Sequence, residues 1–88
     1  MAHQVPWDQR IVEEFVRRAL LSEEEQWLLR SRIGGMGRSQ QAEHLGLSDR
    51  SVDRRIRQLK TKYDHAQKGS DILPPRRARA ADIWTLAQ

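Results

Sequence analysis

Residues 38–57 of this chain read RSQQAEHLGLSDRSVDRRIR, and this stretch decides the fold. Two helices that cross steeply need a small side chain where they approach most closely, and Ala42 provides one. The tight turn between them needs a residue that accepts a positive φ, which Gly46 does without steric cost. Ser48 then follows as an N-cap, because its hydroxyl can accept a hydrogen bond from an amide in the next helix. The stretch therefore predicts two helices joined by a tight turn.

The second of these helices, expected over residues 49–65, has two different faces. Side chains advance by about 100° per residue around a helix. Four apolar side chains then share one narrow sector, which must be the buried side: Val52, Ile56, Leu59 and Tyr63. Polar and cationic side chains lie opposite this sector or close to it: Arg50, Arg54, Arg57, Thr61 and Gln58. Since Arg can donate two hydrogen bonds to guanine O6 and N7, the stretch predicts a helix-turn-helix whose second, recognition helix enters the DNA major groove.

The candidate DNA contacts divide by the part of the duplex that they would meet. Base edges would be read by residues of the recognition helix: Arg50, Ser51, Arg54, Arg57 and Gln58. Phosphate contacts fix position without reading sequence, and helix N-termini attract phosphate. We expect them from Arg38, Ser39, Gln40, Arg55, Lys60 and Lys62. The alternative is that the arginines form an ordinary solvated face.

Asp53, on the same helix, has two interpretations. Its carboxylate could accept a hydrogen bond from cytosine N4. It could instead orient Arg57, one helical turn further on, and we favour this second role.

An amphipathic helix is expected over residues 7–20, where apolar residues recur in adjacent pairs four residues apart. The pairs make a continuous stripe: Ile11, Val12, Phe15, Val16, Ala19 and Leu20. The charged side chains of this helix fall outside the stripe and are expected in solvent: Glu13, Glu14, Arg17 and Arg18.

Capping and stop signals place the remaining helices. Ser22 and Glu25 form a capping box, which opens a second helix, and the glycines at 34–35 end it. A short third helix is expected over 39–45, with Ser39 as its N-cap. No stretch alternates as a strand does, so the fold class is all-α. We expect a small helical bundle of about four helices that contains the helix-turn-helix.

The chain divides into a helical domain over residues 1–68 and a C-terminal tail over 69–88. The two prolines at 74–75 prevent a continuing helix, because the residue before Pro avoids helical angles. The tail is therefore irregular or contains one short extra helix. Trp27 is expected to anchor the core. Trp84 and its apolar neighbours either pack back on the first helix or form a partner or self-association surface, and the sequence leaves this open.

Composition excludes several function classes. The 88 residues allow one modest core. There is no Cys, so disulfides, thiolate zinc sites and thiol nucleophiles are excluded. The three His have no partner at metal-ligand spacing, and we expect no metal, no cofactor and no enzymatic activity. No apolar run approaches the roughly 18 residues of a membrane span, so we expect a cytoplasmic protein without a membrane partner.

The charge is unevenly distributed along the chain, whose formal net charge is +4. Residues 1–29 carry three Arg against six acids, whereas residues 30–68 carry ten Lys and Arg against four acids. Arg accounts for 13 of the basic residues and Lys for only 3, which favours planar, forked hydrogen bonding. A strongly basic centre indicates a polyanionic partner, and double-stranded DNA fits it.

The residues around the turn resemble the helix-turn-helix of sigma factor region 4 and of LuxR-type response regulators. The resemblance covers about residues 21–63 and is carried by Leu21-Ser22, Glu25, Gly35, Ala42, Leu45-Gly46-Leu47-Ser48 and Ser51-Val52. The chain is also similar to small sigma-region-4-like proteins of bacterial and prophage genomes, through Lys62-Tyr63-Asp64 and Leu73-Pro74-Pro75-Arg76. The resemblance implies DNA binding, and in sigma factors this helix reads the −35 promoter element.

The chain departs from these families in two ways. Gln41 stands where they usually have Ile or Val, so the first motif helix is expected to pack less apolar surface. There is also no room for the sigma region that melts the −10 element, so a complete sigma factor is excluded and promoter recognition need not carry over.

The sequence therefore predicts a sequence-specific DNA-binding protein, most plausibly a bacterial or phage transcriptional regulator. Two alternatives stay open. One is an adaptor or inhibitor that binds RNA polymerase, and the other is the DNA-binding subunit of a recombination or packaging complex. Whether the chain forms a homodimer is also left open. Two-fold dimers bind half-sites about 34 Å apart, so a palindromic target would indicate one.

Overall fold

The computed structural model describes residues 7–76, which form four α-helices. In chain order these are α1 (Gln9–Ala19), α2 (Glu23–Ile33), α3 (Arg38–Leu45) and α4 (Asp49–Lys68). Over this part of the chain there is no strand, so the expected all-α class with about four helices is confirmed.

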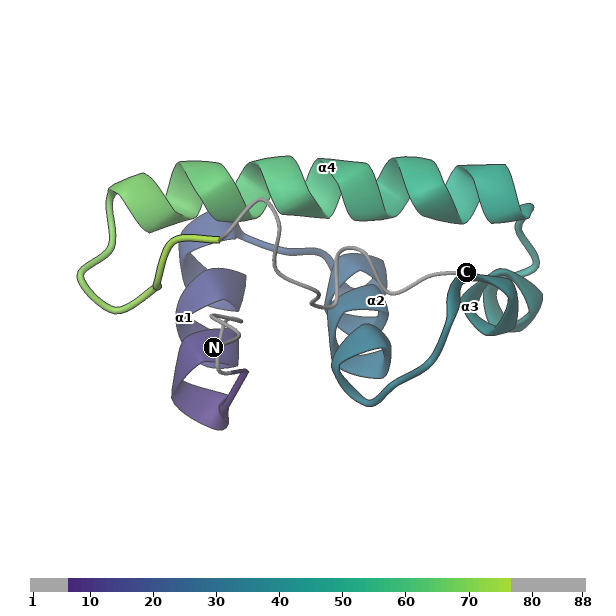
Figure 1. Cartoon of the computed structure of the whole chain (residues 1–88), viewed down its shortest axis with the longest axis horizontal. Helices are drawn as coiled ribbons and strands as arrows, with labels where there is room; N and C mark the ends of the chain where they lie inside the picture. The colour runs from purple at the N-terminus through teal and green to yellow at the C-terminus, as the bar shows by residue number, and fades with distance from the viewer. Residues whose placement is uncertain (1–6, 77–88) are drawn as a thin grey trace.

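The long helix α4 organises the molecule. Figure 1 shows α4 running along the top, with α1, α2 and α3 all below it. Each of the three shorter helices packs against α4. Their apolar side chains join those of α4 in one core, whose fully buried members include Phe15, Leu28, Leu59 and Tyr63. One face of α4 is therefore covered by the rest of the domain.

Helix α1 is shorter than the expected range of 7–20. It begins after Asp8, whose Oδ1 accepts a hydrogen bond from the Ile11 amide at 2.9 Å, and it ends at Ala19. Leu20 then takes the left-handed conformation, with φ 52° and ψ 52°, and its side chain is 84% exposed. The expectation that Leu20 continues the apolar stripe is wrong, because the chain reverses there and Leu21 enters the core instead.

Glu14 corrects a second expectation about α1. Its carboxylate is buried, not solvated. It pairs with Arg18 at 2.5 Å and Arg17 at 2.5 Å, and accepts a hydrogen bond from the Ser70 hydroxyl at 2.8 Å. These hydrogen bonds, that from Arg18 first, lower the pKa of the Glu14 carboxyl. The sequence could not indicate this burial because Ser70 lies 56 residues further along the chain.

The predicted capping box at the start of α2 is confirmed. The Ser22 hydroxyl accepts from the Glu25 amide at 3.1 Å, and Glu25 Oε1 accepts from the Ser22 amide at 2.9 Å. Helix α2 ends at Ile33 before the two glycines, as expected. Trp27 is partly buried against the core and stacks on His44 of α3, with ring centroids 4.4 Å apart.

Helix α3 begins one residue earlier than expected, and Ser39 is not its cap. The N-cap is Gly37, whose amide donates to the side-chain oxygen of Gln40 at 3.2 Å. The Ser39 hydroxyl instead donates to Asp49 Oδ2 at 3.1 Å, which ties the starts of α3 and α4 together. Gly46 takes the left-handed conformation expected of the turn, with φ 69°.

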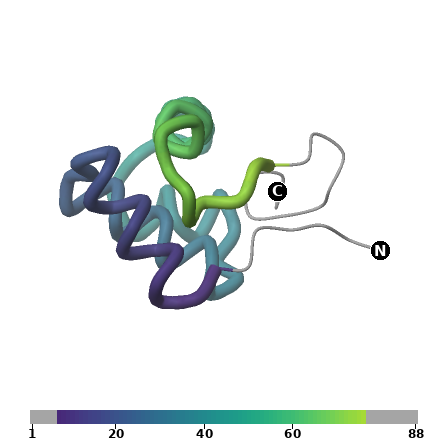
Figure 2. The backbone as a smooth tube through the Cα atoms, turned by 90° about the vertical axis from the view of Figure 1, so that its left-hand side faces the viewer, coloured from purple at the N-terminus to yellow at the C-terminus, as the bar shows by residue number. Residues whose placement is uncertain are grey.

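The described part of the tail packs on the domain. Figure 2, which looks along α4, shows the chain leaving the end of this helix and turning back below it. Leu73 reaches the core, and the Tyr63 hydroxyl donates to the Pro74 carbonyl. Arg76 donates two hydrogen bonds to the Asp64 carboxylate, at 2.8 and 2.6 Å. The expectations about Trp84 and a last short helix concern residues outside the described range.

Trp7, the first described residue, packs against two other rings. Its ring centroid lies 6.2 Å from that of Phe15 and 5.5 Å from that of Tyr63. The Phe15 and Tyr63 rings meet edge to face at 5.2 Å. Aromatic contacts of this kind favour edge-on geometry and fix the crossing of α1 with α4.

Candidate nucleic-acid interface

The two faces of α4 are arranged as the sequence predicts. The helix begins after Ser48, whose hydroxyl accepts from the Ser51 amide at 3.1 Å, and it extends three residues beyond the expected end at 65. All four residues of the predicted apolar sector are buried. The opposite side is exposed and forms a surface that we call the outward face: Arg50, Arg54, Arg57, Gln58 and Thr61.

Among residues 7–76, the three arginines of the outward face have no carboxylate partner. The side chains of Arg50, Arg54 and Arg57 make no hydrogen bond or ion pair with any residue in the range 7–76. Their guanidinium groups therefore keep all their donors available. Gln58, also exposed, makes no hydrogen bond within the same range. Ser51 is half-buried, and its hydroxyl accepts a hydrogen bond from the Ser48 hydroxyl at 3.1 Å.

The spacing of this stripe suits a groove of DNA. Arg50 and Arg57 are seven residues apart, which is about 10 Å along a helix axis. Successive base pairs of B-DNA are about 3.4 Å apart, so the stripe covers about three of them. The major groove is about 12 Å wide and admits a helix. Three forked donors can thus meet consecutive base edges without bending the helix.

The flank of α4 that faces α2 is occupied by ion pairs. Arg55 pairs with Glu24, and Lys62 Nζ lies 2.6 Å from Glu25 Oε2. Partial burial by itself would raise the pKa of the Glu25 carboxyl. Hydrogen bonds from Lys62 and from the Ser22 amide outweigh this effect, so the pKa is lowered. Both cations were expected to contact phosphate, and the structure places each against a carboxylate of α2.

The opposite flank, beside α3, is also paired. Arg38 Nη1 lies 2.8 Å from Asp53 Oδ2, and Arg38 Nε lies 3.6 Å from Asp49 Oδ2. The expectation that Asp53 orients Arg57 is therefore not met, because its carboxylate holds the first residue of α3 instead. The short turn between α3 and α4 brings these residues together although they are 15 positions apart.

The structure places the six residues that were predicted to contact phosphate in three different environments. Arg38, Arg55 and Lys62 lie in ion pairs. The hydroxyl of Ser39 and the side chain of Gln40 are bound at the start of α3, to Asp49 and to the Gly37 amide. Lys60 is half-buried and makes no hydrogen bond or ion pair within the described range.

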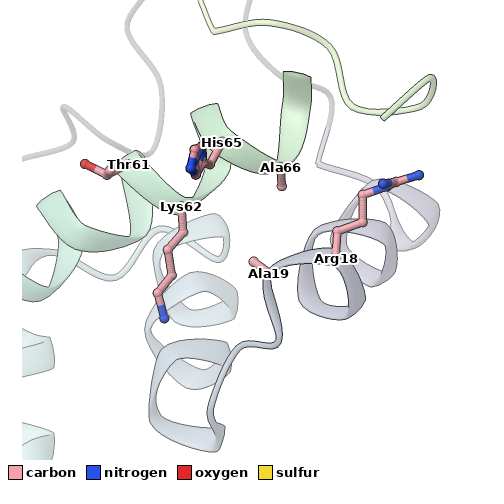
Figure 3. Close-up of a pocket in the computed structure, with 6 residues that line it drawn as sticks. All are labelled: Arg18, Ala19, Thr61, Lys62, His65 and Ala66. Atoms are coloured by element: carbon pink, nitrogen blue, oxygen red, sulfur yellow. The ribbon is translucent and has the colours of Figure 1, made fainter. Parts of the chain in front are cut away.

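Two depressions border α4. One, of about 560 Å³, opens on the outward face and is lined by Glu25, Arg54, Arg57, Gln58, Thr61 and Lys62. The other, of about 320 Å³, lies between the end of α1 and α4 and is lined by Arg18, Ala19, Thr61, Lys62, His65 and Ala66. Figure 3 shows the Lys62 side chain extending from α4 toward α2, whereas Thr61 points in another direction.

Sequence reasoning missed the buried polar side chains between α2 and α3. Gln41 was expected only to weaken the packing of α3, yet it is fully buried and hydrogen-bonded to Arg32 of α2. The pairing of Glu24 and Glu25 with cations of α4 was also missed. Residues 31 and 37 positions apart give no periodic signal. Only the excess of acids in 23–25 opposite a basic helix hinted at such pairs.

Within residues 7–76 no group of three or more potential metal-ligating side chains comes together. None of the helices formed by these residues combines the length and the apolar character that a bilayer span requires. The outward face is a candidate nucleic-acid interface because of the exposure, spacing and charge of its side chains. Comparisons with protein-family models, with curated proteins and with solved structures found no match.

Proposed function

We propose that this chain binds double-stranded DNA sequence-specifically, with α4 as the recognition helix in the major groove. The observation that carries the proposal is the outward face, where Arg50, Arg54 and Arg57 project without partners among the described residues. Two other cations of α4, Arg55 and Lys62, are paired with carboxylates of α2, so the absence of partners here is not shared by every cation of the helix.

The proposed binding mode assigns a task to each group. The three arginines read base edges with both arms, and Ser51 and Gln58 lie beside them. Lys60 is the phosphate contact that the geometry supports best of the six candidates, because it carries no ion pair. The start of α3 is fixed to α4 through the ion pair of Arg38 with Asp53, and the free amides of a helix N-terminus attract phosphate.

The biological role that we propose is transcriptional regulation in the cytoplasm of a bacterium or a phage-infected cell. The resemblance of residues 21–63 to sigma region 4 and to LuxR-type regulators supports this role. A palindromic target would further indicate that the chain binds as a homodimer, with one helix in each of two successive major grooves.

Selection of bound sequences from random duplexes tests the proposal with the full chain. We expect one enriched site and an affinity that falls steeply with salt, by about 0.9 in log–log slope for each phosphate neutralised. The double variant Arg54→Ala/Arg57→Ala should lose the preference for the selected site. Arg10→Ala/Arg30→Ala removes the same charge from exposed positions on α1 and α2 and should keep that preference.

The absence of duplex binding at low salt would contradict the proposal. It would instead favour a role as an adaptor on RNA polymerase, which a binding assay with the polymerase would then address. Equal affinity for the selected and the scrambled duplex would also count against sequence-specific recognition by α4.

A further inference from the structure

We propose that Glu24 and Glu25 withhold Arg55 and Lys62 from DNA phosphates, and so limit sequence-independent binding while leaving base reading intact. The proposal rests on the proposed function, since it concerns the same surface of α4. It assigns to the first turn of α2 a role in specificity that its part in helix capping does not require.

The first observation is that the two ion pairs, Arg55 with Glu24 and Lys62 with Glu25, join the same two helices. Both carboxylates come from the first turn of α2, and both cations lie on one flank of α4, two turns apart. Arg55 and Lys62 keep 40% and 42% of their side chains exposed, so burial does not keep them from the solvent. The carboxylates of Glu24 and Glu25 instead keep the two cations from a phosphate, because each ion pair directs the positive charge back toward α2.

The second observation is that the pairs border the base-reading surface. Glu25 and Lys62 line the same depression as Arg54, Arg57 and Gln58. An ammonium or guanidinium released at this edge would lie next to the groove walls, where the phosphates run. In the native chain Lys62 extends toward α2 (Figure 3), away from that position.

The third observation is that Glu25 is held in place. Its Oε1 accepts from the Ser22 amide while its Oε2 pairs with Lys62. The carboxylate is therefore oriented by the helix cap before any ligand arrives. Carboxylates in a first helical turn are also favoured by the helix dipole. Glu23, exposed beside the pairs, adds a further negative charge that repels phosphate from this flank.

The two ion pairs are expected to affect sequence-independent affinity and base discrimination differently. Phosphate contacts supply most sequence-independent binding and set its salt dependence. Base contacts supply discrimination. Two cations of α4 that are bound to carboxylates contribute less to sequence-independent binding, while the base contacts are unchanged. The ratio of specific to nonspecific affinity therefore rises.

The double variant Glu24→Gln/Glu25→Gln tests this inference. Gln at position 25 still completes the capping box, so α2 keeps its start. We expect the log–log salt slope for a random-sequence duplex to steepen by about 1.8, which is about 0.9 for each cation released. Affinity for the random duplex should rise at least tenfold at low salt, and by a larger factor than affinity for the selected site.

A matched control removes the same charge elsewhere. Glu13 on α1 and Asp71 in the tail are exposed and pair with no cation of the described range. Glu13→Gln/Asp71→Asn should leave the salt slope of the native chain unchanged. Far-ultraviolet circular dichroism of every variant reports whether the helices persist.

The cations themselves provide the decisive comparison. In the Glu24→Gln/Glu25→Gln background, adding Arg55→Ala/Lys62→Ala should return the slope to its native value. In the native background the same two substitutions should leave the slope unchanged, and this measurement stands even if the glutamate variants fail to fold.

Two results would overturn the inference alone: an unchanged slope on releasing the cations, or a native slope that falls when Arg55 and Lys62 are removed. The second result would mean that both already contact phosphate. Failure of the native chain to bind any duplex would instead overturn the proposed function, and this inference with it.

Discussion

Arg32 of α2 donates two hydrogen bonds to one oxygen of Gln41 in α3, from Nε at 3.2 Å and from Nη2 at 2.8 Å. Both side chains are buried. The amide of Gln41 in turn donates to the Leu28 carbonyl at 3.1 Å and to the Ser31 hydroxyl at 2.8 Å. Burial lowers the pKa of the Arg32 guanidinium, and the Asp53 carboxylate acts in the opposite direction. A satisfied polar network thus fixes α3 against α2 through a buried polar side chain.

This network makes Gln41→Leu strongly destabilising, although leucine is the more hydrophobic residue. The substitution removes the oxygen that accepts two hydrogen bonds from the buried Arg32, and we expect the free energy of unfolding to fall by about 3 kcal/mol. Urea denaturation measures it. The double variant Arg32→Met/Gln41→Leu should recover much of the loss, because it removes the buried charge together with the polar side chain that binds it. Additive losses in the two single variants and the double would show that the two side chains do not depend on each other.

Leu20→Gly is expected to stabilise the protein. Leu20 has a positive φ and an exposed side chain, so the substitution relieves backbone strain and loses little packing. Allowing for the greater freedom of glycine in the unfolded chain, the net gain should be about 0.5 kcal/mol. Gly46→Ala is the opposite control. A Cβ there meets nothing within 4 Å, so the cost of about 1 kcal/mol comes from its φ of 69° alone. Thermal or urea unfolding that moves both variants in one direction would contradict this account.

Stability should fall in acid through Glu14 and Glu25. The pKa of each carboxyl is lower in the folded chain than the ordinary value of 4.5. The unfolded chain therefore binds more protons between the two values, so stability rises with pH in that window. The contribution is fully present above about pH 4.5 and is lost as the pH falls through the lower, folded pKa. Urea unfolding at several pH values should show a shallower acid loss in Glu14→Gln than in Glu13→Gln, which removes an exposed neighbour.

Arg54→Lys separates base reading from simple charge. Lysine keeps the positive charge but lacks the forked donors that fit guanine O6 and N7. We expect the affinity for the selected site to drop by about 1–3 kcal/mol, with relaxed preference at one base position. The salt slope should stay unchanged, since no phosphate contact is removed. Unchanged affinity and unchanged base preference would mean that a positive charge alone suffices at position 54, and would move the base-reading stripe elsewhere on α4.

The division of α4 into two faces could be predicted from the sequence, because both faces follow from the period of a single helix. Val52 and Tyr63 lie on one side and Arg54 on the other whatever the helix packs against. The capping box at Ser22 is local in the same sense, since its hydrogen bonds span only three residues.

The partners of the charged side chains could not be predicted in this way. Exposure of Arg50, Arg54 and Arg57 follows from helix geometry, but whether a carboxylate of the described residues reaches them depends on which acids other elements bring to α4. Glu24 meets Arg55 across 31 residues, and Ser70 covers Glu14 across 56. Such contacts depend on how the helices cross and where the tail folds back, and no local periodicity encodes either.

Helical periodicity and capping residues were sufficient to predict four helices, the caps at Ser22 and Ser48, the glycine turn and the direction in which three arginines project. The packing of the helices and of residues 69–76 sets which cations pair with carboxylates and which polar groups are buried. The physical reason is range. Backbone hydrogen bonds and helical periodicity act over three or four residues, whereas the pairing of charges depends on the packing of segments that are distant in the chain.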